Sequence, residues 1–279
     1  MNEKKKCLLL GLGIVFVLLI GFTVGWRLQD YVEQENRENA ISKETVAEAE
    51  KAEKEIPIYF VEMEEKKLAI SFDAAWGCER TEKILDVLRK YNVQATFFLT
   101  NIWLDDYPDM AKKIADAGHE IAMHSVTHPH MSQISREEVA RELDGNYQRI
   151  VEVTGYTPQL FRFPFGEYDN KSIDVVREKG YYPIQWSIDS LDWMESKTAE
   201  DIIDRVKLGL HPGAIILCHN NGTYTAEAIE EIIPYAQQQG YQFVPVGQLI
   251  YKGDYETDHQ GMEKMPLEKD TPEDKNTAQ

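Results

Sequence analysis

Short apolar runs alternate with amphipathic segments between residues 57 and 251. Runs rich in β-branched and aromatic side chains predict strands at 68–72, 95–99, 120–123, 160–163, 182–186, 214–218 and 242–246. Segments with helical spacing lie between them, at 81–91, 108–117, 135–154, 171–179, 198–210 and 226–239. This alternation predicts an α/β fold in which crossover helices connect the strands of a parallel sheet.

Local signals support the predicted helix ends. Ser135 and Thr198 each precede an acidic residue three positions further on, a pattern typical of a capped helix start. Glycines follow four predicted helices, as left-handed C-caps commonly do: Gly118, Gly155, Gly180 and Gly240. The number of strand and helix units favours a distorted (β/α)7-type barrel of parallel strands, with an open doubly wound sheet as the alternative. No glycine-rich phosphate-binding motif follows a strand, so the sequence gives no support to nucleotide binding.

The chain begins with a basic segment followed by a long apolar one. Residues 7–26 carry no charge and approach the roughly 20 residues that span a bilayer as a helix. We expect residues 1–6 to be a cytoplasmic basic segment and residues 7–26 a transmembrane signal anchor, with a cleaved signal peptide as the alternative. The positive-inside rule then predicts a single-pass cell-membrane protein with a cytoplasmic N-terminus and an extracellular domain.

Two charged segments flank the predicted domain. Residues 27–56 have too few large apolar side chains to build a core and predict a charged stalk, and residues 252–279 predict an acidic disordered tail. One folded domain remains, at residues 57–251. The net charge of −18 excludes a typical nucleic-acid binder, which needs a cationic face. Pairing between Cys78 and Cys218 stays open, as does the oligomeric state.

Polar residues gather where the predicted strands end. Asp73, His124, Arg162, Asp189 and His219 all close or follow such a strand. Because the carboxyl ends of barrel strands form one face, we expect these side chains to share one pocket. His124 is followed four residues later by a second histidine, and the two imidazoles can converge on one divalent cation; turn-capping or solvated histidines are the alternative.

Five short segments, in this order, resemble the polysaccharide deacetylases of the NodB-homology type, carbohydrate esterase family four. They are Ser71-Phe-Asp-Ala-Ala-Trp-Gly77, His124-Ser-Val-Thr-His128, Arg162-Phe-Pro-Phe-Gly166, Asp189-Ser-Leu-Asp-Trp193 and Ile216-Leu-Cys-His-Asn220. The resemblance spans nearly all of residues 68–251. The first segment looks most like the branch associated with sporulation and cell walls in Gram-positive bacteria.

The resemblance implies hydrolysis of N-acetyl groups from an aminosugar polymer such as peptidoglycan or a chitin-like glycan. It implies that His124 and His128 hold a divalent metal, with zinc expected, and that Asp73 is the general base. Arg162 is matched to the residue that pairs with this aspartate, and a nearby cation favours the charged form of a carboxylate. These residues would activate the water that attacks the acetyl carbonyl.

The remaining matched positions complete the implied reaction. By the resemblance, the backbone N–H of Phe165 donates to the oxyanion and His219 is the general acid. Asp192 would hold the His219 imidazole, and Trp193 and Leu217 would wall the acetyl pocket. Trp76 and Trp103 either stack on sugar rings or belong to the core.

One position departs from the family pattern. The usual first segment has two consecutive aspartates, the second of which is a metal ligand, but here Ala74 follows Asp73. A catalytic zinc normally has three protein ligands, so either metal binding is weaker here or a third ligand comes from elsewhere, such as Asp73 itself or a residue in the loop from Trp76 to Glu79. A metal-dependent deacetylase is favoured because the other matched side chains persist. A glycan-binding domain without turnover and a metal-independent amidohydrolase are the alternatives.

Overall fold

The computed structural model describes residues 31, 34–35, 37, 54–253 and 255–265. The chain divides into two compact units, residues 1–54 and residues 55–279, and the second contains the predicted domain. The predicted basic segment, the predicted membrane anchor and most of the predicted stalk lie outside the described residues. Within the described ranges, no helix combines the length and the apolar character that crossing a membrane requires.

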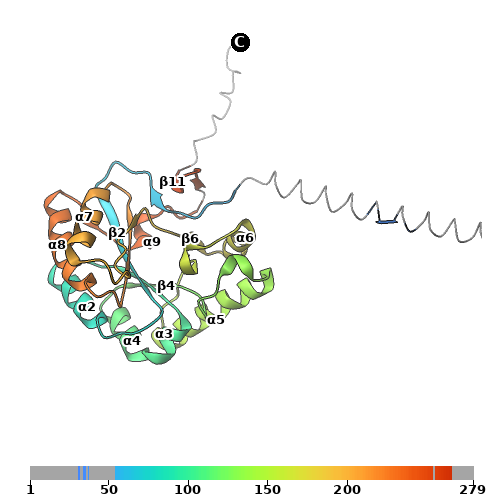
Figure 1. The fold of residues 1–279 in the computed structure, drawn as a ribbon, viewed down its shortest axis with the longest axis horizontal. Coiled ribbons are helices and arrows are strands. Elements are labelled where there is room, and N and C mark those ends of the chain that lie inside the picture. The colour runs from blue at the N-terminus through green and yellow to red at the C-terminus, as the bar shows by residue number, and fades with distance from the viewer. Residues whose placement is uncertain (1–30, 32–33, 36, 38–53, 254, 266–279) are drawn as a thin grey trace, which may run out of the picture. The chain divides into compact units, whose positions relative to one another are not determined.

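A curled parallel sheet forms the centre of the domain, with helices around its outside (Figure 1). Its strands are β2 (Lys67–Ala74), β3 (Thr96–Leu99), β4 (Glu120–Met123), β5 (Leu160–Arg162), β6 (Tyr182–Ile184), β7 (Ile188–Asp189), β8 (Ile215–His219) and β9 (Gln242–Phe243). The order is β6-β5-β4-β3-β2-β8-β7, with β9 pairing to the start of β2. This order fits the predicted β/α barrel.

An N-terminal segment contacts strands at both halves of this order. Ile58 forms a parallel bridge to Ile184 of β6, and Phe60 forms an antiparallel bridge to Ala214, which directly precedes β8. Ile58 is fully buried. Because β6 and β7 end the strand order, these bridges connect the region around its open edge.

The helices match the predicted ranges closely. They are α2 (Thr81–Lys90), α3 (Asn101–Asp106), α4 (Pro108–Asp116), α5 (Arg136–Thr154), α6 (Asn170–Glu178), α7 (Ala199–Gly209), α8 (Thr225–Gln238) and α9 (Val246–Leu249). The six predicted helices lie within one residue of α2 and α4 to α8 at each end. Helices α3 and α9 were not predicted, and the predicted strand at 242–246 begins as β9 and ends in the first residue of α9. It also missed β7, which is only two residues long.

The predicted caps form as their chemistry requires. The Ser135 side chain accepts from the backbone N–H of Glu138, whose side chain accepts from the backbone N–H of Ser135. The corresponding exchange at α7 links Thr198 and Asp201. Gly155 ends α5 with φ of 71°, a left-handed conformation in which a β-carbon is disfavoured.

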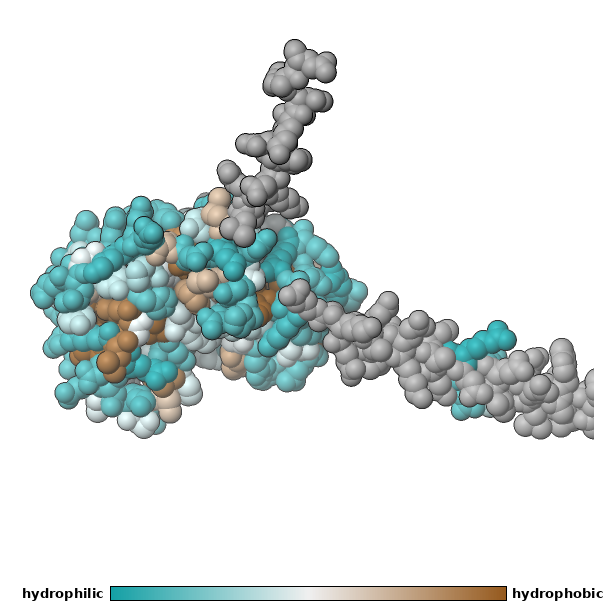
Figure 2. Space-filling model, turned by 90° about the horizontal axis from the view of Figure 1, so that it is seen from above, coloured by the Kyte–Doolittle hydropathy of each residue, from teal (hydrophilic) through white to brown (hydrophobic). Residues whose placement is uncertain are grey.

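Two apolar layers surround the strands of the sheet. Leu68, Ile70 and Phe72 of β2 belong to a large cluster that the helices cover, while Ala69 belongs to a smaller cluster on the other face. Burial on both faces is typical of parallel sheets, and it explains why β2 reads as a continuous apolar run. On the face of the domain that Figure 2 shows, hydrophilic residues dominate, with hydrophobic patches between them.

The predicted disordered tail is wrong for part of its length. Within residues 255–265, β10 (Glu256–Thr257) and β11 (Met262–Lys264) form a three-stranded sheet with β1 (Phe60–Val61). Glu263 is fully buried there and accepts a hydrogen bond from the backbone N–H of Tyr251. Charged composition concealed these strands, because their order comes from pairing with β1 rather than from an apolar core. Residues 266–279 of the predicted tail lie outside the described residues.

Candidate active site

Neighbouring strands place an aspartate beside a histidine. Asp73 of β2 and His219 of β8 are register partners in a parallel pair, so their backbones lie directly side by side. Strand alternation puts Leu217 on the same face as His219 and puts Cys218 in the cluster beneath the helices. The side chain of Asp73 is 9% exposed and that of His219 is 25% exposed.

A fully buried arginine holds Asp73. Arg162 Nη1 donates to Asp73 Oδ1 at 2.7 Å, Nη2 donates to the Gln185 carbonyl at 3.1 Å, and the guanidinium lies 3.9 Å from the Phe98 ring centroid. Burial alone would raise the pKa of Asp73, but the charge of Arg162, with those of His124 and His219, outweighs burial and lowers it. Burial lowers the pKa of Arg162 as well, yet a guanidinium keeps its proton. Asp73 is therefore an ionised carboxylate.

A second buried carboxylate holds His219. Asp192 Oδ1 lies 2.8 Å from His219 Nδ1, and Oδ2 accepts from the His219 backbone N–H at 2.8 Å. Burial would lower the pKa of His219, but the hydrogen bond and charge of Asp192 outweigh burial and raise it. Because a carboxylate accepts hydrogen bonds, Nδ1 donates, which leaves Nε2 for other partners. This pairing is the arrangement expected of a general acid.

The turn after β4 carries the two histidines, and α5 holds that turn. Asn146, fully buried on α5, accepts from the backbone N–H groups of His124 and Ser125 and donates to the Leu99 carbonyl. Glu142, one turn earlier on α5, accepts from the backbone N–H groups of residues 126 and 127. Ser125 and His128 both adopt positive φ, of 77° and 55°. These bonds support a conformation that is unfavourable for non-glycine residues.

The two histidine rings meet, with centroids 4.9 Å apart. His124 Nδ1 lies 2.9 Å from the Arg162 carbonyl, and its Nε2 lies 3.5 Å from Asp73 Oδ2. His128 Nδ1 is buried without a hydrogen-bond partner, as a ligand nitrogen awaiting a cation would be. Burial is the main cause of the low pKa of His128, which is about 3. The ring is therefore neutral near pH 7, with a proton on only one of its two nitrogens. These features suit two metal ligands.

Asp73 is the carboxylate nearest to His124, at 3.5 Å, but the described residues do not form a three-ligand group. In the part of the chain that the structure describes, no three His, Cys, Asp or Glu side chains are grouped so as to hold a metal ion. Ala74 is fully buried in the apolar cluster beneath the helices, and its carbonyl accepts from the Thr100 backbone N–H. The donor set therefore does not fit a complete catalytic zinc site, which takes three protein ligands.

The turn after β5 presents Phe165 at the site. Phe165 has φ of 58° in the short turn Pro164–Gly166, and the residue is 53% exposed. Gln185, which is 1% exposed, donates from Nε2 to the Gly166 carbonyl at 3.0 Å. Gln185 thus contacts both this turn and Arg162, and no motif in the sequence pointed to it. Asn146, in contrast, was detectable, because it lies on the apolar stripe of α5 between Leu143 and Ile150.

Exposed aromatic rings surround the histidine turn. The His128 ring lies edge-on to Trp76 at 5.0 Å and to Phe165 at 4.4 Å, and Phe165 stacks on His130 at 4.4 Å. Trp76 is 55% exposed, and so is available to a ligand. Trp193 is 58% exposed and follows Asp192, while Leu217 is buried two residues before His219 on β8.

Trp103 and the two cysteines of the domain have structural rather than binding or disulfide roles. Trp103 is fully buried and donates from Nε1 to the Gly77 carbonyl, so it belongs to the core. Cys78 and Cys218 are both free thiols, and burial raises the pKa of Cys218 well above its ordinary value. Cys218 is therefore a packing residue.

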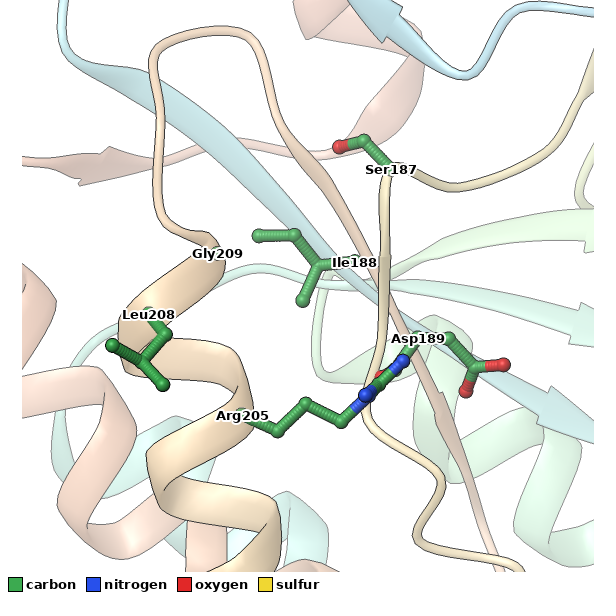
Figure 3. A pocket seen from close by; sticks show the side chains of 6 residues that line it. All are labelled: Ser187, Ile188, Asp189, Arg205, Leu208 and Gly209. Carbon is green, nitrogen blue, oxygen red and sulfur yellow. The ribbon is translucent and has the colours of Figure 1, made fainter.

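Asp189 has a structural position. Its carboxylate accepts from the Leu191 backbone N–H at 2.9 Å, and its carbonyl accepts from Arg205 Nε. Figure 3 shows it on the wall of a hollow of about 500 Å³ between β7 and α7, together with Arg205 and Leu208. This hollow is lined by different residues from those around Asp73.

The fold and these pairs define a carbohydrate-esterase type of site, and comparisons with known proteins agree. The polysaccharide deacetylase family model matches residues 60–184. The Bacillus subtilis peptidoglycan-N-acetylmuramic acid deacetylase PdaA is 31% identical over 203 residues, which cover 72% of this chain and 77% of that protein. The chain therefore belongs to the polysaccharide deacetylase family, a family of hydrolases that act on carbon–nitrogen bonds other than peptide bonds.

Two further relatives bear on function. The uncharacterised Bacillus subtilis protein YlxY is 36% identical over 195 residues, which cover 70% of this chain but only 60% of that protein. The crystal structure of BA3943 from Bacillus anthracis has a TM-score of 0.67 at 32% identity and covers 69% of this chain and 68% of that one. BA3943 is described as a CE4 family pseudoenzyme, and a mutant of it as having restored enzymatic activity.

Proposed function

We propose that the chain is an N-deacetylase of an aminosugar polymer, with peptidoglycan as the expected substrate. One observation carries this proposal: a charged carboxylate and a carboxylate-paired imidazole lie on neighbouring strands as register partners. Amide hydrolysis needs a base for the attacking water and an acid for the departing amine, and these two groups supply both. The deacetylase PdaA among the relatives supports the choice of substrate class.

The reaction follows from the positions of the protonatable groups. Asp73 accepts a proton from water as the water oxygen bonds to the acetyl carbon, and the carbonyl oxygen gains negative charge. The backbone N–H of Phe165 would donate to that oxygen. His219 then gives its proton to the amine nitrogen as the carbon–nitrogen bond breaks, leaving acetate and a free amino sugar. No step is assigned to a metal, because the ligand set is incomplete.

The surface around the pocket suits a polymer rather than a free sugar. Among the described residues, the exposed large hydrophobic side chains include Trp76, Phe165, Trp193 and Tyr224, all of which follow carboxyl ends of strands. Aromatic faces give large apolar contacts to ligands, and several of them beyond the strand ends would provide contacts for more than one sugar ring.

A second candidate function is a glycan-binding domain with little or no turnover. Ala74 in place of a ligand favours it, as does the likeness to the pseudoenzyme BA3943. The two candidates differ in chemistry and share the same binding surface. Oligosaccharide binding without acetate release would favour the second.

Membrane attachment is part of the proposal. The charge-free stretch at residues 7–26, preceded by Lys4–Lys6, supports an anchor with a cytoplasmic N-terminus and an extracellular domain. A protease added to intact cells should then remove the domain from the cell surface. A domain that stays protected until the cells are lysed would contradict this topology.

The reaction is tested with matched aspartate variants of the full chain. Asp73→Asn removes the base and is expected to lower acetate release by a factor of about 100 or more. Asp189→Asn is the control, because Asp189 is also at a strand end, its carboxylate bonds the next turn, and its charge is the weakest of those that raise the pKa of His219. Equal loss in the two variants would contradict the role of Asp73.

A further inference from the structure

A buried threonine completes the hydrogen bonding of Asp192. Thr225 is the first residue of α8 and is fully buried. Its Oγ1 donates to Asp192 Oδ2 at 2.5 Å, on the same oxygen that accepts from the His219 backbone N–H. Oδ1 remains for His219 Nδ1, so each carboxylate oxygen has a separate task.

The chain closes tightly over this contact. A β-carbon at Gly222 would lie 2.2 Å from Thr225 Oγ1 and 2.9 Å from Asp192 Oδ2, so any larger residue would displace one of them. The Thr225 backbone N–H donates to the Gly222 carbonyl, which keeps the threonine in this position. The loop between β8 and α8 is thus shaped around Asp192.

The hydrogen bond from Thr225 restricts rotation of the Asp192 carboxylate. The last torsion of an aspartate is broad and two-fold, so one backbone donor on Oδ2 constrains the carboxylate plane less than two donors do. A second donor on Oδ2 fixes the plane and directs Oδ1 at His219 Nδ1. That bond decides which imidazole nitrogen is protonated in the neutral ring.

We propose that Thr225 is a positioning residue whose hydroxyl fixes Asp192, and through Asp192 the orientation and tautomer of His219. Its expected effect on turnover rests on the proposed deacetylase function, whereas its effect on the tautomer does not. Thr225 touches neither substrate nor reacting atoms in this role. It acts through Asp192 alone.

The test uses the full chain with ¹⁵N-labelled histidine and the isosteric variant Thr225→Val. At a pH where the ring is neutral, the wild type should show His219 protonated on Nδ1, and Thr225→Val should shift the ¹⁵N signals toward the Nε2-protonated form. Thr225→Ser should restore the wild-type signals. Turnover by Thr225→Val is expected to fall about 10- to 100-fold in kcat with little change in KM, as for other residues that orient a reactive group.

Thr81→Val is the matched control. Thr81 is also buried at the first position of its helix, but its hydroxyl accepts from Asn220 rather than donating to Asp192. We expect this variant to keep the Nδ1-protonated signature even if its thermal stability falls. The proposal is overturned if Thr225→Val keeps that signature, if Thr225→Ser fails to restore it, or if Thr81→Val loses it equally. Because the ¹⁵N signals do not depend on substrate, a chain without turnover still decides the matter.

Discussion

Charge placement at single residues determines what this site does. Asp73 is buried beside Arg162, and His219 is paired with Asp192, so each reactive group has one dedicated partner of opposite charge. The first pair lowers the pKa of Asp73 and the second raises the pKa of His219, which favours an ionised aspartate and a protonated histidine. A base and an acid with separated pKa values are the condition for acid–base catalysis at one pH.

The pH dependence of turnover should reflect the effect of Asp192 on the pKa of His219. The pKa of His219 is raised above the ordinary histidine value of 6.5, so kcat/KM should begin to fall on the alkaline side at a higher pH than it would with an ordinary histidine. Asp192→Asn removes the charge that outweighs burial, so the limb should move to lower pH. The measurement is the kcat/KM profile of both proteins. An alkaline limb that stays in place would show that another group sets it.

Ala74 should limit metal affinity. Ala74→Asp adds a carboxylate where the family pattern has a ligand, and a third ligand is expected to raise zinc affinity by about tenfold or more. Calorimetric titration with zinc alone measures this gain. The same substitution in a His128→Ala background should lose the gain, since two ligands then remain. An unchanged affinity for Ala74→Asp would show that position 74 does not reach the histidines.

At the scale of elements, helices hold the loops that carry the chemistry. The histidine turn follows β4, but α5 fixes it through Asn146 and Glu142. The Phe165 turn follows β5, but Gln185, just beyond β6, fixes it. Each loop therefore depends on an element that is distant in sequence, which allows backbone conformations with positive φ to persist.

Removing the Asn146 side chain should lower the stability of the domain by weakening the histidine turn. Asn146→Ala leaves the backbone N–H groups of His124 and Ser125 and the Leu99 carbonyl without this partner. The His124 N–H and the Leu99 carbonyl still bond to each other, so only the Ser125 N–H is left unpaired, and we expect a loss of about 1–3 kcal/mol in the free energy of unfolding in urea. A loss below about 0.5 kcal/mol would mean that the turn is held by other contacts.

At the scale of the whole molecule, segments before and after the barrel pair with each other. β1 and β11 are parallel neighbours, and β11 carries the fully buried Glu263. Burial raises the pKa of Glu263 to about 8, because one backbone hydrogen bond does not offset its desolvation. The folded chain thus keeps a proton that the unfolded chain releases.

This proton makes stability depend on pH in a definite direction. Since the folded pKa is raised from 4.5 to about 8, the contribution of Glu263 is full below pH 4.5 and is lost as pH rises toward 8. The free energy of unfolding therefore falls by at most about 1.4 kcal/mol for each pH unit in this range. Glu263→Gln keeps an acceptor for Tyr251 without the titration, so its melting temperature should exceed that of the wild type more at pH 8 than at pH 5. An equal difference at both pH values would contradict this account.

The sequence was sufficient where local patterns determine structure. Helical spacing and caps predicted α2 and α4 to α8 within one residue at each end, and the strand-end positions predicted the meeting of Asp73, Arg162, His124 and His219. It was insufficient where order depends on distant partners. The two-residue β7 and the strands after residue 255 form only by pairing, and Gln185 and Thr225 matter only through contacts that no local pattern reveals.

The most direct test is the mass of the product. The full-length protein is incubated with N-acetylglucosamine oligomers and with peptidoglycan fragments, and the sugars are analysed by mass spectrometry. We expect products that lack acetyl groups from the wild-type chain, and none above background from Asp73→Asn. Sugars that stay fully acetylated with the wild-type chain, while the same oligomers bind to it, would contradict the deacetylase and identify a glycan-binding domain instead.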